Sequence, residues 1–233
     1  MSSANWTACT GVLGTNDCAR GVTSGPTKPN GGGTFLYAMN SITNTVGGLA
    51  FYTAQVSFAP MSSGCDISGA VKRGPSGGTT GFSAFLFVGL GGTALTDEGY
   101  MLGISDANPG RIELRKGALS VGLPDEAPGG VNKILRRSTE SVAIDVWTHL
   151  RLEQVVNANG DVILNCYKSD LVANAVTAPV WVAIPGMDPY TDDALGIASG
   201  SFPKTSGRAG FGGQFSDVTR RCYFDHLVVK RQT

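Results

Sequence analysis

Two histidines with acidic neighbours are the first candidates for catalysis in this sequence. His149 lies shortly after Asp145, and His226 directly follows Asp225. A nucleophilic triad needs a histidine that is hydrogen-bonded both to a nucleophile and to an orienting carboxylate. Adjacent residues of a strand point to opposite faces, so Asp225 and His226 are not expected to bond, and no Gly-x-Ser-x-Gly motif occurs. The sequence therefore does not predict catalysis by either histidine.

Glycoside hydrolysis would need two carboxylates held on one face across a sugar. The acidic residues instead occur as adjacent pairs, Asp97-Glu98, Asp125-Glu126 and Asp192-Asp193, which we interpret as solvated turns. No Glu-x-Asp-x-Glu pattern lies on one expected strand. The sequence therefore does not predict a glycosidase.

A third pattern concerns polysaccharide cleavage. The run Arg111-Ile112-Glu113-Leu114-Arg115 resembles the Arg-x-Glu-Leu-Arg strand of a family of alginate lyases, which have a jelly-roll fold. That family also has a Gln-x-His strand and a Tyr-Phe-Lys-x-Gly segment, where this chain has Trp147-Thr148-His149 and Cys222-Tyr223-Phe224-Asp225. An amphipathic strand with its charged residues outward explains the run equally. A lyase or hydrolase using Glu113, Arg115 and His149 is our third functional hypothesis.

Metal, phosphate and disulfide chemistry leave few candidates. The five cysteines are scattered without a Cys-x-x-Cys pair, so no zinc site is expected. Their odd number predicts a buried thiol or a bond to another chain. Asp225 is a candidate calcium ligand, although calcium needs several oxygen ligands and the sequence does not show the others. No phosphate-binding glycine motif occurs, and no other cofactor is expected.

Composition limits the partners. Charged residues make up 15% of the 233 positions, and 18 basic side chains cancel 18 acidic ones. Such a neutral chain is not expected to bind nucleic acid. No apolar stretch is long enough to span a bilayer, so we expect no membrane insertion. The N-terminus lacks the pattern of a secretory signal, which predicts folding in a cytosol.

The elements expected to position these residues are almost all strands. Short runs rich in aromatic and β-branched residues alternate with turn signals, which is typical of a β-sandwich or barrel. The expected strands are Thr34–Ala38, Leu49–Phe58, Phe82–Leu90, Gly99–Ile104, Arg111–Arg115, Trp147–Val156, Asp161–Lys168, Val180–Ile184, Ala209–Gly213 and Cys222–Val229. Trp147–Val156 and Asp161–Lys168 flank an Asn-Ala-Asn-Gly turn and predict an antiparallel hairpin. Val131–Val146 is ambiguous between helix and strand.

Glycine and proline divide the rest of the chain. Residues 1–33 are punctuated by both and predict an extended N-terminal arm, followed by a single sandwich domain over residues 34–233. Gly64–Gly81 and Pro185–Pro203 are interpreted as long loops, a kind of connection that is usually functional when ordered.

The order of the expected strands carries a resemblance. The strand Trp147–Leu152, the Asn159-Gly160 hairpin and the closing run Tyr223–Val229 together resemble a concanavalin A-like or laminin G-like domain. This resemblance implies a jelly roll, that is, a two-sheet antiparallel β-sandwich. Gly74–Phe82 and Pro179–Asp188 resemble uncharacterised virion proteins of tailed bacteriophages, which implies a structural role without catalytic residues.

Two non-enzymatic functions follow from these patterns. The first is a structural virion protein, assembled in the host cytoplasm, whose partners are other virion proteins and copies of itself. Its contacts would come from the arm, through Trp6, Cys9 and Cys18. The alternative is a carbohydrate-binding module for a host-surface glycan, with Tyr190 or Tyr100 as the exposed aromatic platform. Trp181 could also serve, but Trp181 and Trp147 are expected to fill the core.

Overall fold

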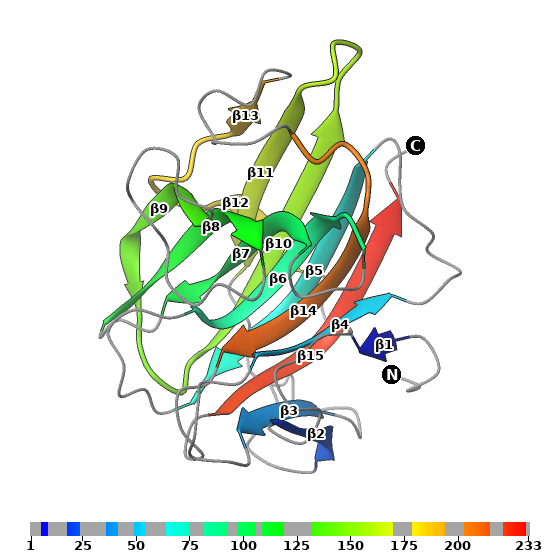
Figure 1. Ribbon diagram of the computed structural model, residues 1–233. Helices are drawn as coiled ribbons and strands as arrows, with labels where there is room; N and C mark the ends of the chain where they lie inside the picture. The colour runs from blue at the N-terminus through cyan, green and yellow to red at the C-terminus, as the bar shows by residue number, and fades with distance from the viewer. Residues whose placement is uncertain are drawn as a thin grey trace.

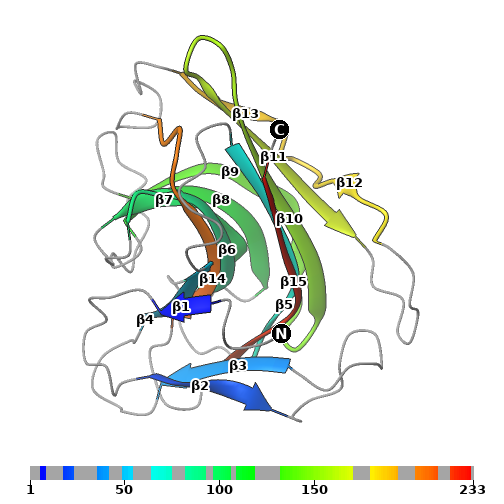
Figure 2. The same cartoon turned by 90° about the vertical axis from the view of Figure 1, so that its right-hand side faces the viewer.

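The fold is all-β, with two antiparallel sheets packed face to face (Figures 1 and 2). The computed structural model describes residues 6–8, 18–23, 36–41, 49–54, 64–74, 82–92, 97–105, 109–118, 132–169, 179–193, 203–214 and 221–231. Within these ranges no helix is long and apolar enough to cross a membrane. The predicted two-sheet jelly-roll sandwich is confirmed.

The strands that make up the two sheets come from all parts of the chain. Among the described residues the first sheet has the order β1 (Trp6–Ala8), β4 (Leu49–Ala54), β14 (Arg208–Gln214), β6 (Phe82–Leu90), β7 (Glu98–Ser105), β8 (Gly110–Ala118) and β9 (Asn132–Val142). The second sheet has the order β12 (Val182–Ala183), β11 (Val162–Ser169), β10 (Trp147–Val156), β5 (Gly64–Arg73), β15 (Arg221–Arg231), β3 (Leu36–Ser41) and β2 (Cys18–Thr23), and β13 (Tyr190–Asp192) also pairs with β11. We call them the β6 sheet and the β5 sheet.

The core lies between the two sheets and is built from alternate residues of strands in both, among them β5, β7 and β10. Leu102 of β7 in the β6 sheet, and Ile67 of β5 and Leu150 of β10 in the β5 sheet, have no exposed surface. Each such side chain contributes roughly 1.5–3 kcal/mol by leaving water. Residues between these core positions face away from the other sheet, which defines an outer face for each sheet.

The predicted hairpin is confirmed as β10 and β11. Its two strands pair in register from His149 opposite Ser169 to Val156 opposite Val162. The turn is stabilised by Asn157, whose Oδ1 accepts hydrogen bonds from the amides of Asn159 and Asp161 at 2.9 Å. Gly160 takes a left-handed conformation there, at φ +85°, that glycine adopts without strain.

The predicted loop at Gly64–Gly81 is wrong over its first ten residues. Gly64–Arg73 forms β5, which pairs with β10 on one side and β15 on the other. Small residues make this strand difficult to recognise in the sequence, and one of them packs closely against a neighbouring strand. A Cβ atom on Gly69 would lie 2.6 Å from Cδ2 of Leu227, because an irregularity in β15 places Leu227 over this position. A missing side chain therefore signals close packing here rather than a turn.

The boundaries of other elements differ less from the predicted ones. Within the ambiguous segment Val131–Val146, Asn132–Val142 forms a strand, β9, and a turn follows it. The predicted strand Val180–Ile184 shortens to β12, and the predicted loop Pro185–Pro203 contains the short strand β13.

Much of the segment 1–33 lies outside the described residues, so its separation from a domain at 34–233 stays a prediction. In two parts of this segment the structure describes the course of the backbone. Strand β1 pairs with β4 at one edge of the β6 sheet, and β2 pairs with β3 at one edge of the β5 sheet. Cys9 lies outside the described residues, as do the side chains of Trp6 and Cys18.

Candidate functional site

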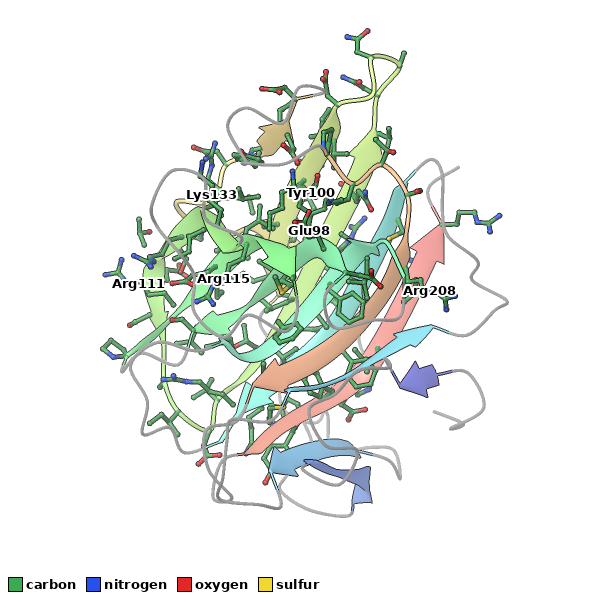
Figure 3. The ribbon with its side chains drawn as sticks, viewed as in Figure 1. Glu98, Tyr100, Arg111, Arg115, Lys133 and Arg208 are labelled. Carbon is green, nitrogen blue, oxygen red and sulfur yellow. The ribbon has the colours of Figure 1, made fainter. Side chains whose placement is uncertain are left out.

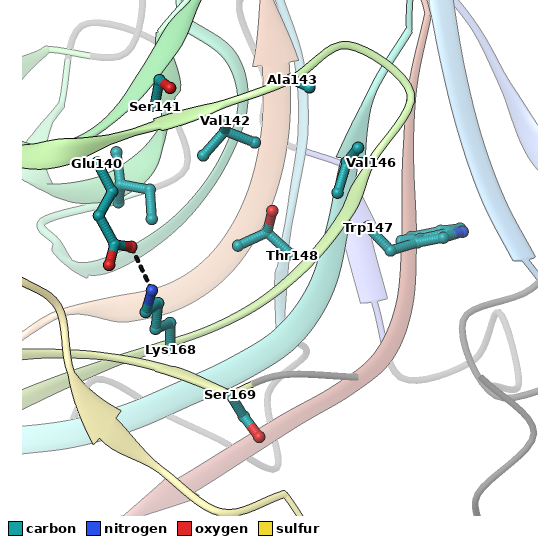
Figure 4. Close-up of a pocket in the computed structure, with 10 residues that line it drawn as sticks. Glu140, Ser141, Val142, Ala143, Val146, Trp147, Thr148, Lys168 and Ser169 are labelled. Carbon is teal, nitrogen blue, oxygen red and sulfur yellow. Dashed lines mark hydrogen bonds and ion pairs between the residues drawn. The ribbon is translucent and has the colours of Figure 1, made fainter. Parts of the chain in front are cut away.

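A hollow of about 430 Å³ lies between the sheets where the chain passes from β9 to β10 (Figure 4). We call it the end hollow. Its lining comes from β8, the end of β9, the following turn, the start of β10 and the end of β11. Because β8 and β9 belong to one sheet and β10 and β11 to the other, its shape depends on how the two sheets stack.

Arg73, at the end of β5, holds the two sheets together beside the hollow. Its side chain is fully buried, and its guanidinium donates to the carbonyl of Ser105 at 2.9 Å and to that of Val142 at 3.3 Å. Both acceptors belong to the β6 sheet, whereas Arg73 belongs to the β5 sheet. Gly110 leaves room for this side chain, since a Cβ atom there would lie 2.8 Å from Cζ of Arg73.

Contacts with β5 also hold the turn between β9 and β10 in place. Asp145 adopts a left-handed conformation at φ 60°, and its amide donates to the carbonyl of Arg73 at 3.1 Å. Its carboxylate lies 3.2 Å from Nζ of Lys72. Asparagine and aspartate are among the few non-glycine residues that accept this conformation readily, which accounts for an aspartate at the turn.

An ion pair joins the two sheets across the hollow. Glu140 on β9 and Lys168 on β11 bond through Oε2 and Nζ, as the dashed line in Figure 4 shows. Both side chains are partly exposed, at 42% and 22% respectively. The pair therefore offers a ligand one acceptor and one donor at fixed positions while adding no net charge.

The remaining lining is apolar with a hydroxyl group. Ile112 and Val142 are buried and supply an apolar surface, and Thr148 adds a hydroxyl. Trp147 also borders the hollow, but its ring points away from the ion pair (Figure 4), as alternation with Thr148 requires. Such a lining suits a small polyol that also presents carbon-bound hydrogens.

Tyr100 and Tyr190 do not form the exposed platform that the sequence suggested, because both are buried. The Tyr100 hydroxyl donates to Oδ2 of Asp192 at 2.5 Å, and the guanidinium of Arg136 lies 4.8 Å from the Tyr190 ring centroid. Strand β13, which carries Tyr190 and Asp192, lies within a predicted loop, so no sequence pattern indicated this burial.

The tryptophans were expected in the core, and this too is corrected. Trp147 and Trp181 are both only partly buried. Trp181 meets the ring of His149 edge-on, with 4.9 Å between ring centroids, on the outer face of the β5 sheet. Nζ of Lys72 lies 5.9 Å from the Trp147 ring centroid, a cation–π distance.

His149 faces away from Leu150 and Leu152 as expected, but it is only 3% exposed. Burial, followed by the nearby charge of His226, lowers the pKa of His149 to about 4. Its Nδ1 atom has no hydrogen-bond partner among the described residues. The imidazole is therefore neutral at physiological pH.

Glu113 and Arg115 lie on the outer face of the β6 sheet and are not solvated, unlike the simple outward placement we expected. Glu113 is 3% exposed, and its carboxylate bonds Nε of Arg115 and Nε of Arg137, each at 2.8 Å. Arg115 is labelled in Figure 3. His149 faces outward from the other sheet, so the structure does not bring together the three residues of the lyase hypothesis.

Asp225 and His226 do approach each other, which corrects the expectation from strand alternation. The register of β15 shifts after Asp225, and His226 takes a left-handed conformation at φ 51°. Nδ1 of His226 then lies 3.5 Å from Oδ2 of Asp225. His226 is exposed, and no nucleophile accompanies the pair in a described contact.

Asp225 stays a predicted calcium ligand. Its Oδ1 accepts from the His226 amide at 2.8 Å, and its Oδ2 faces an imidazole. The described part of the chain holds no group of three or more metal-ligating side chains. Calcium normally takes six or more oxygen ligands, which also come from backbone carbonyls and water.

Three of the five cysteines are buried thiols in strands, namely Cys65, Cys166 and Cys222. Burial raises the pKa of Cys65 and of Cys166 to about 12, which makes both unreactive. The odd number of cysteines predicted either a buried thiol or a bond to another chain, and these three residues agree with the buried thiol. A bond to another chain would fall to Cys9 or Cys18, and that possibility stays a prediction.

Sequence reasoning missed Glu140, Thr148, Lys168 and Ser169. Glu140 and Lys168 are far apart in sequence and lie on strands of different sheets. No local motif marks such a pair. Only the stacking of the two sheets brings them together.

Neither a family model nor a curated protein matches the chain at significant similarity. Solved structures do. The carbohydrate-binding module CBM66 from Bacillus subtilis aligns with 97% of this chain and 95% of its own at 12% identity, with a TM-score of 0.51. The VIP36 exoplasmic/lumenal domain in its Ca2+/Man3GlcNAc-bound form aligns with 99% of this chain and 86% of its own at 11% identity, with a TM-score of 0.51.

A third similar structure is an enzyme, the PL-14 alginate lyase from Aplysia kurodai. It aligns with 95% of this chain and 89% of its own at 10% identity, with a TM-score of 0.55. Together with the sheet order, these likenesses show that the chain has the two-sheet jelly-roll fold seen in lectin-like domains. At such low identity the likeness is one of fold, which carries no site from one protein to another.

Proposed function

We propose that this chain is a carbohydrate-binding domain whose site is the end hollow. The observation that carries the proposal is the lining, in which a neutral ion pair, Glu140–Lys168, stands over the apolar side chains of Ile112 and Val142. A sugar ring combines hydroxyls, which both donate and accept, with an apolar face of C–H groups. The hollow presents complements to both.

The volume and charge favour a small neutral saccharide. Pockets for small ligands span roughly 300–1,000 Å³, and this hollow lies at the lower end of that range. The carboxylate of Glu140 accepts from one sugar hydroxyl and the ammonium of Lys168 donates to another. The hydroxyl of Thr148 adds a further partner. One or two sugar rings fit this description.

The similar structures support the proposal at the level of fold. They include a carbohydrate-binding module and a lumenal domain bound to a mannose-containing glycan. One of the similar structures is an alginate lyase, so the fold also occurs in an enzyme. We propose binding without bond cleavage, because Glu113 and Arg115 are separated from His149 by the whole sandwich and the end hollow contains one carboxylate.

A glycan array followed by calorimetry with its best ligand tests the site. Lys168→Met should weaken binding at least tenfold, because one desolvated charge-assisted hydrogen bond is worth roughly 1.5–3 kcal/mol. Lys230→Met is a matched control, since Lys230 is exposed on β15. Equal losses in the two variants would contradict the site, and an array without any bound glycan would contradict the function.

The virion role remains a prediction from the sequence. It includes the virion location, the partnership with other virion proteins and self-assembly, and nothing in the fold supports it over other roles. The virion role and the carbohydrate-binding role are compatible if the ligand is a glycan of the host surface, because a virion protein that mediates adsorption binds such a glycan. Detection of the chain in purified phage particles is the direct measurement.

A further inference from the structure

A buried lysine and a buried aspartate meet near the β13 edge of the sandwich, apart from the end hollow. Nζ of Lys116 lies 2.6 Å from Oδ2 of Asp192, and the two side chains are 1% and 0% exposed. Lys116 is on β8 of the β6 sheet. Asp192 is on β13, which pairs with β11 of the β5 sheet. The contact therefore joins the two sheets.

A third group completes the arrangement. The Tyr100 hydroxyl donates to the same oxygen, Oδ2 of Asp192, at 2.5 Å and itself accepts from the amide of Lys204 at 2.9 Å. Nζ of Lys116 lies 5.6 Å from the centroid of the Tyr100 ring. Tyr100 lies on β7, as does Glu98, and both are labelled in Figure 3; Tyr100 has no exposed surface. The amine, the carboxyl and a proton-carrying hydroxyl are thus fixed together.

We propose that Lys116 and Asp192 react with each other to form an isopeptide bond that cross-links β8 to β13. The chemistry needs no outside reagent. The amine of Lys116 and the hydroxyl of Tyr100 both contact Oδ2 of Asp192 already, and the nitrogen must move only from this oxygen to the adjoining carbon.

The reaction balances as a condensation. The ammonium of Lys116 passes one proton to Oδ2, which leaves a neutral amine and a carboxylic acid. The nitrogen lone pair then attacks Cγ of Asp192 and forms the C–N bond. A second proton moves from nitrogen to Oδ2, while the Tyr100 hydroxyl, which donates to Oδ2, stabilises the negative charge on that oxygen. The Cγ–Oδ2 bond breaks, water leaves, and one hydrogen stays on the amide nitrogen.

Burial favours each step. A charged pair taken out of water is costly, whereas the neutral amine and acid, and then the amide, are less so. Desolvation lowers the pKa of the Lys116 amine, and it raises the pKa of Tyr100, which keeps the phenol protonated as a donor. Holding nucleophile and electrophile in contact replaces a bimolecular encounter by an intramolecular one, which raises effective molarity greatly.

Intact mass measured under denaturing conditions tests the proposal. The full chain should be lighter than its sequence by one water, and digestion should yield a branched peptide that joins the segments around Lys116 and Asp192. Lys116→Arg and Asp192→Ala should each restore the full sequence mass. Asp192→Asn should lose ammonia in place of water, because the leaving group is then an amine. The mass is read on the denatured chain, but Asp192→Asn must first fold for its bond to form.

The matched control is Lys72→Arg. Lys72 also contacts an aspartate, Asp145, but that carboxylate is 55% exposed, so the loss of one water should persist in this variant. A wild-type mass equal to the full sequence mass overturns the proposal. A water loss that persists in Lys116→Arg also overturns it, because it would indicate cyclisation of another side chain. Both results are independent of whether the end hollow binds a sugar.

Discussion

His149 shows how a covering side chain changes the chemistry of a residue on the outer face of a sheet. Its strand position was predicted correctly, yet Trp181 closes over it and leaves it 3% exposed. The groups that face it are neutral or mutually compensating: Trp181, the His226 side chain, and Asp225, which lies 3.5 Å from His226. Without a carboxylate bonded to its own ring, His149 has nothing to offset desolvation, so the neutral form is favoured.

His149→Phe should flatten the dependence of the unfolding free energy on pH between about 6.5 and 4. The pKa is about 4 in the folded chain and 6.5 ordinarily, so the unfolded state takes up the proton first as pH falls. The wild type is therefore fully stabilised above 6.5 and loses stability as pH falls toward 4. The loss between about pH 7 and pH 4.5 should be roughly 2 kcal/mol greater than in the variant.

Urea unfolding at the two pH values measures this difference. The control is His226→Gln, which removes the exposed imidazole on the same face and should leave most of the pH dependence in place. Parallel pH profiles for His149→Phe and the wild type would contradict the assignment of the dependence to His149.

At the level of elements, strands in which apolar and polar residues alternate could be predicted from the sequence, whereas strands without this pattern could not. Strands β10 and β11 alternate apolar and polar residues around an Asn-Gly turn, so the hairpin matched to within one residue at each end. Strand β5 combines three small residues, Ser68, Gly69 and Ala70, with a charged end at Lys72-Arg73, which reads as a loop. Its neighbours bury it, and a sequence pattern does not show neighbours.

The candidate site could not be predicted for a related reason. Each of its polar residues is ordinary in its own strand, and only the stacking of two sheets places Glu140 beside Lys168. The predicted aromatic platform failed because Tyr190 lies on β13, and this short strand turns it inward. Local patterns thus identified strands, whereas contacts between sheets depended on information from the whole chain.

A substitution in β5 tests whether residues 64–73 form a central strand or a loop. Ile67→Ala should lower the unfolding free energy by about 2–5 kcal/mol, the usual cost of emptying a fully buried aliphatic position. Val228→Ala, on the neighbouring strand β15, should cost under about 1 kcal/mol because Val228 is 42% exposed. Denaturant unfolding compares the two variants, and equal small effects would indicate that residues 64–73 are not a core strand.

At the scale of the whole molecule, the two sheets are held together by more than the apolar core. Arg73 reaches from the β5 sheet to two carbonyls of the β6 sheet, Glu140 pairs with Lys168, and Lys116 meets Asp192. Two of these ties border the end hollow, because Arg73 bonds the carbonyl of Val142, which lines it. Stability and the shape of the proposed sugar site are therefore linked through how the sheets stack.

Arg73→Met is the variant that tests this link. Methionine preserves much of the buried volume but leaves the carbonyls of Ser105 and Val142 without these two donors, which should cost about 2–5 kcal/mol of unfolding free energy. Because Val142 then loses its anchor, sugar affinity should fall even under conditions where the variant is fully folded. Arg111→Met, an exposed change on β8, should alter neither quantity. Thermal unfolding and calorimetry with the array ligand measure both, and a large loss of stability with unchanged affinity would show that the end hollow keeps its shape without the Arg73 tie.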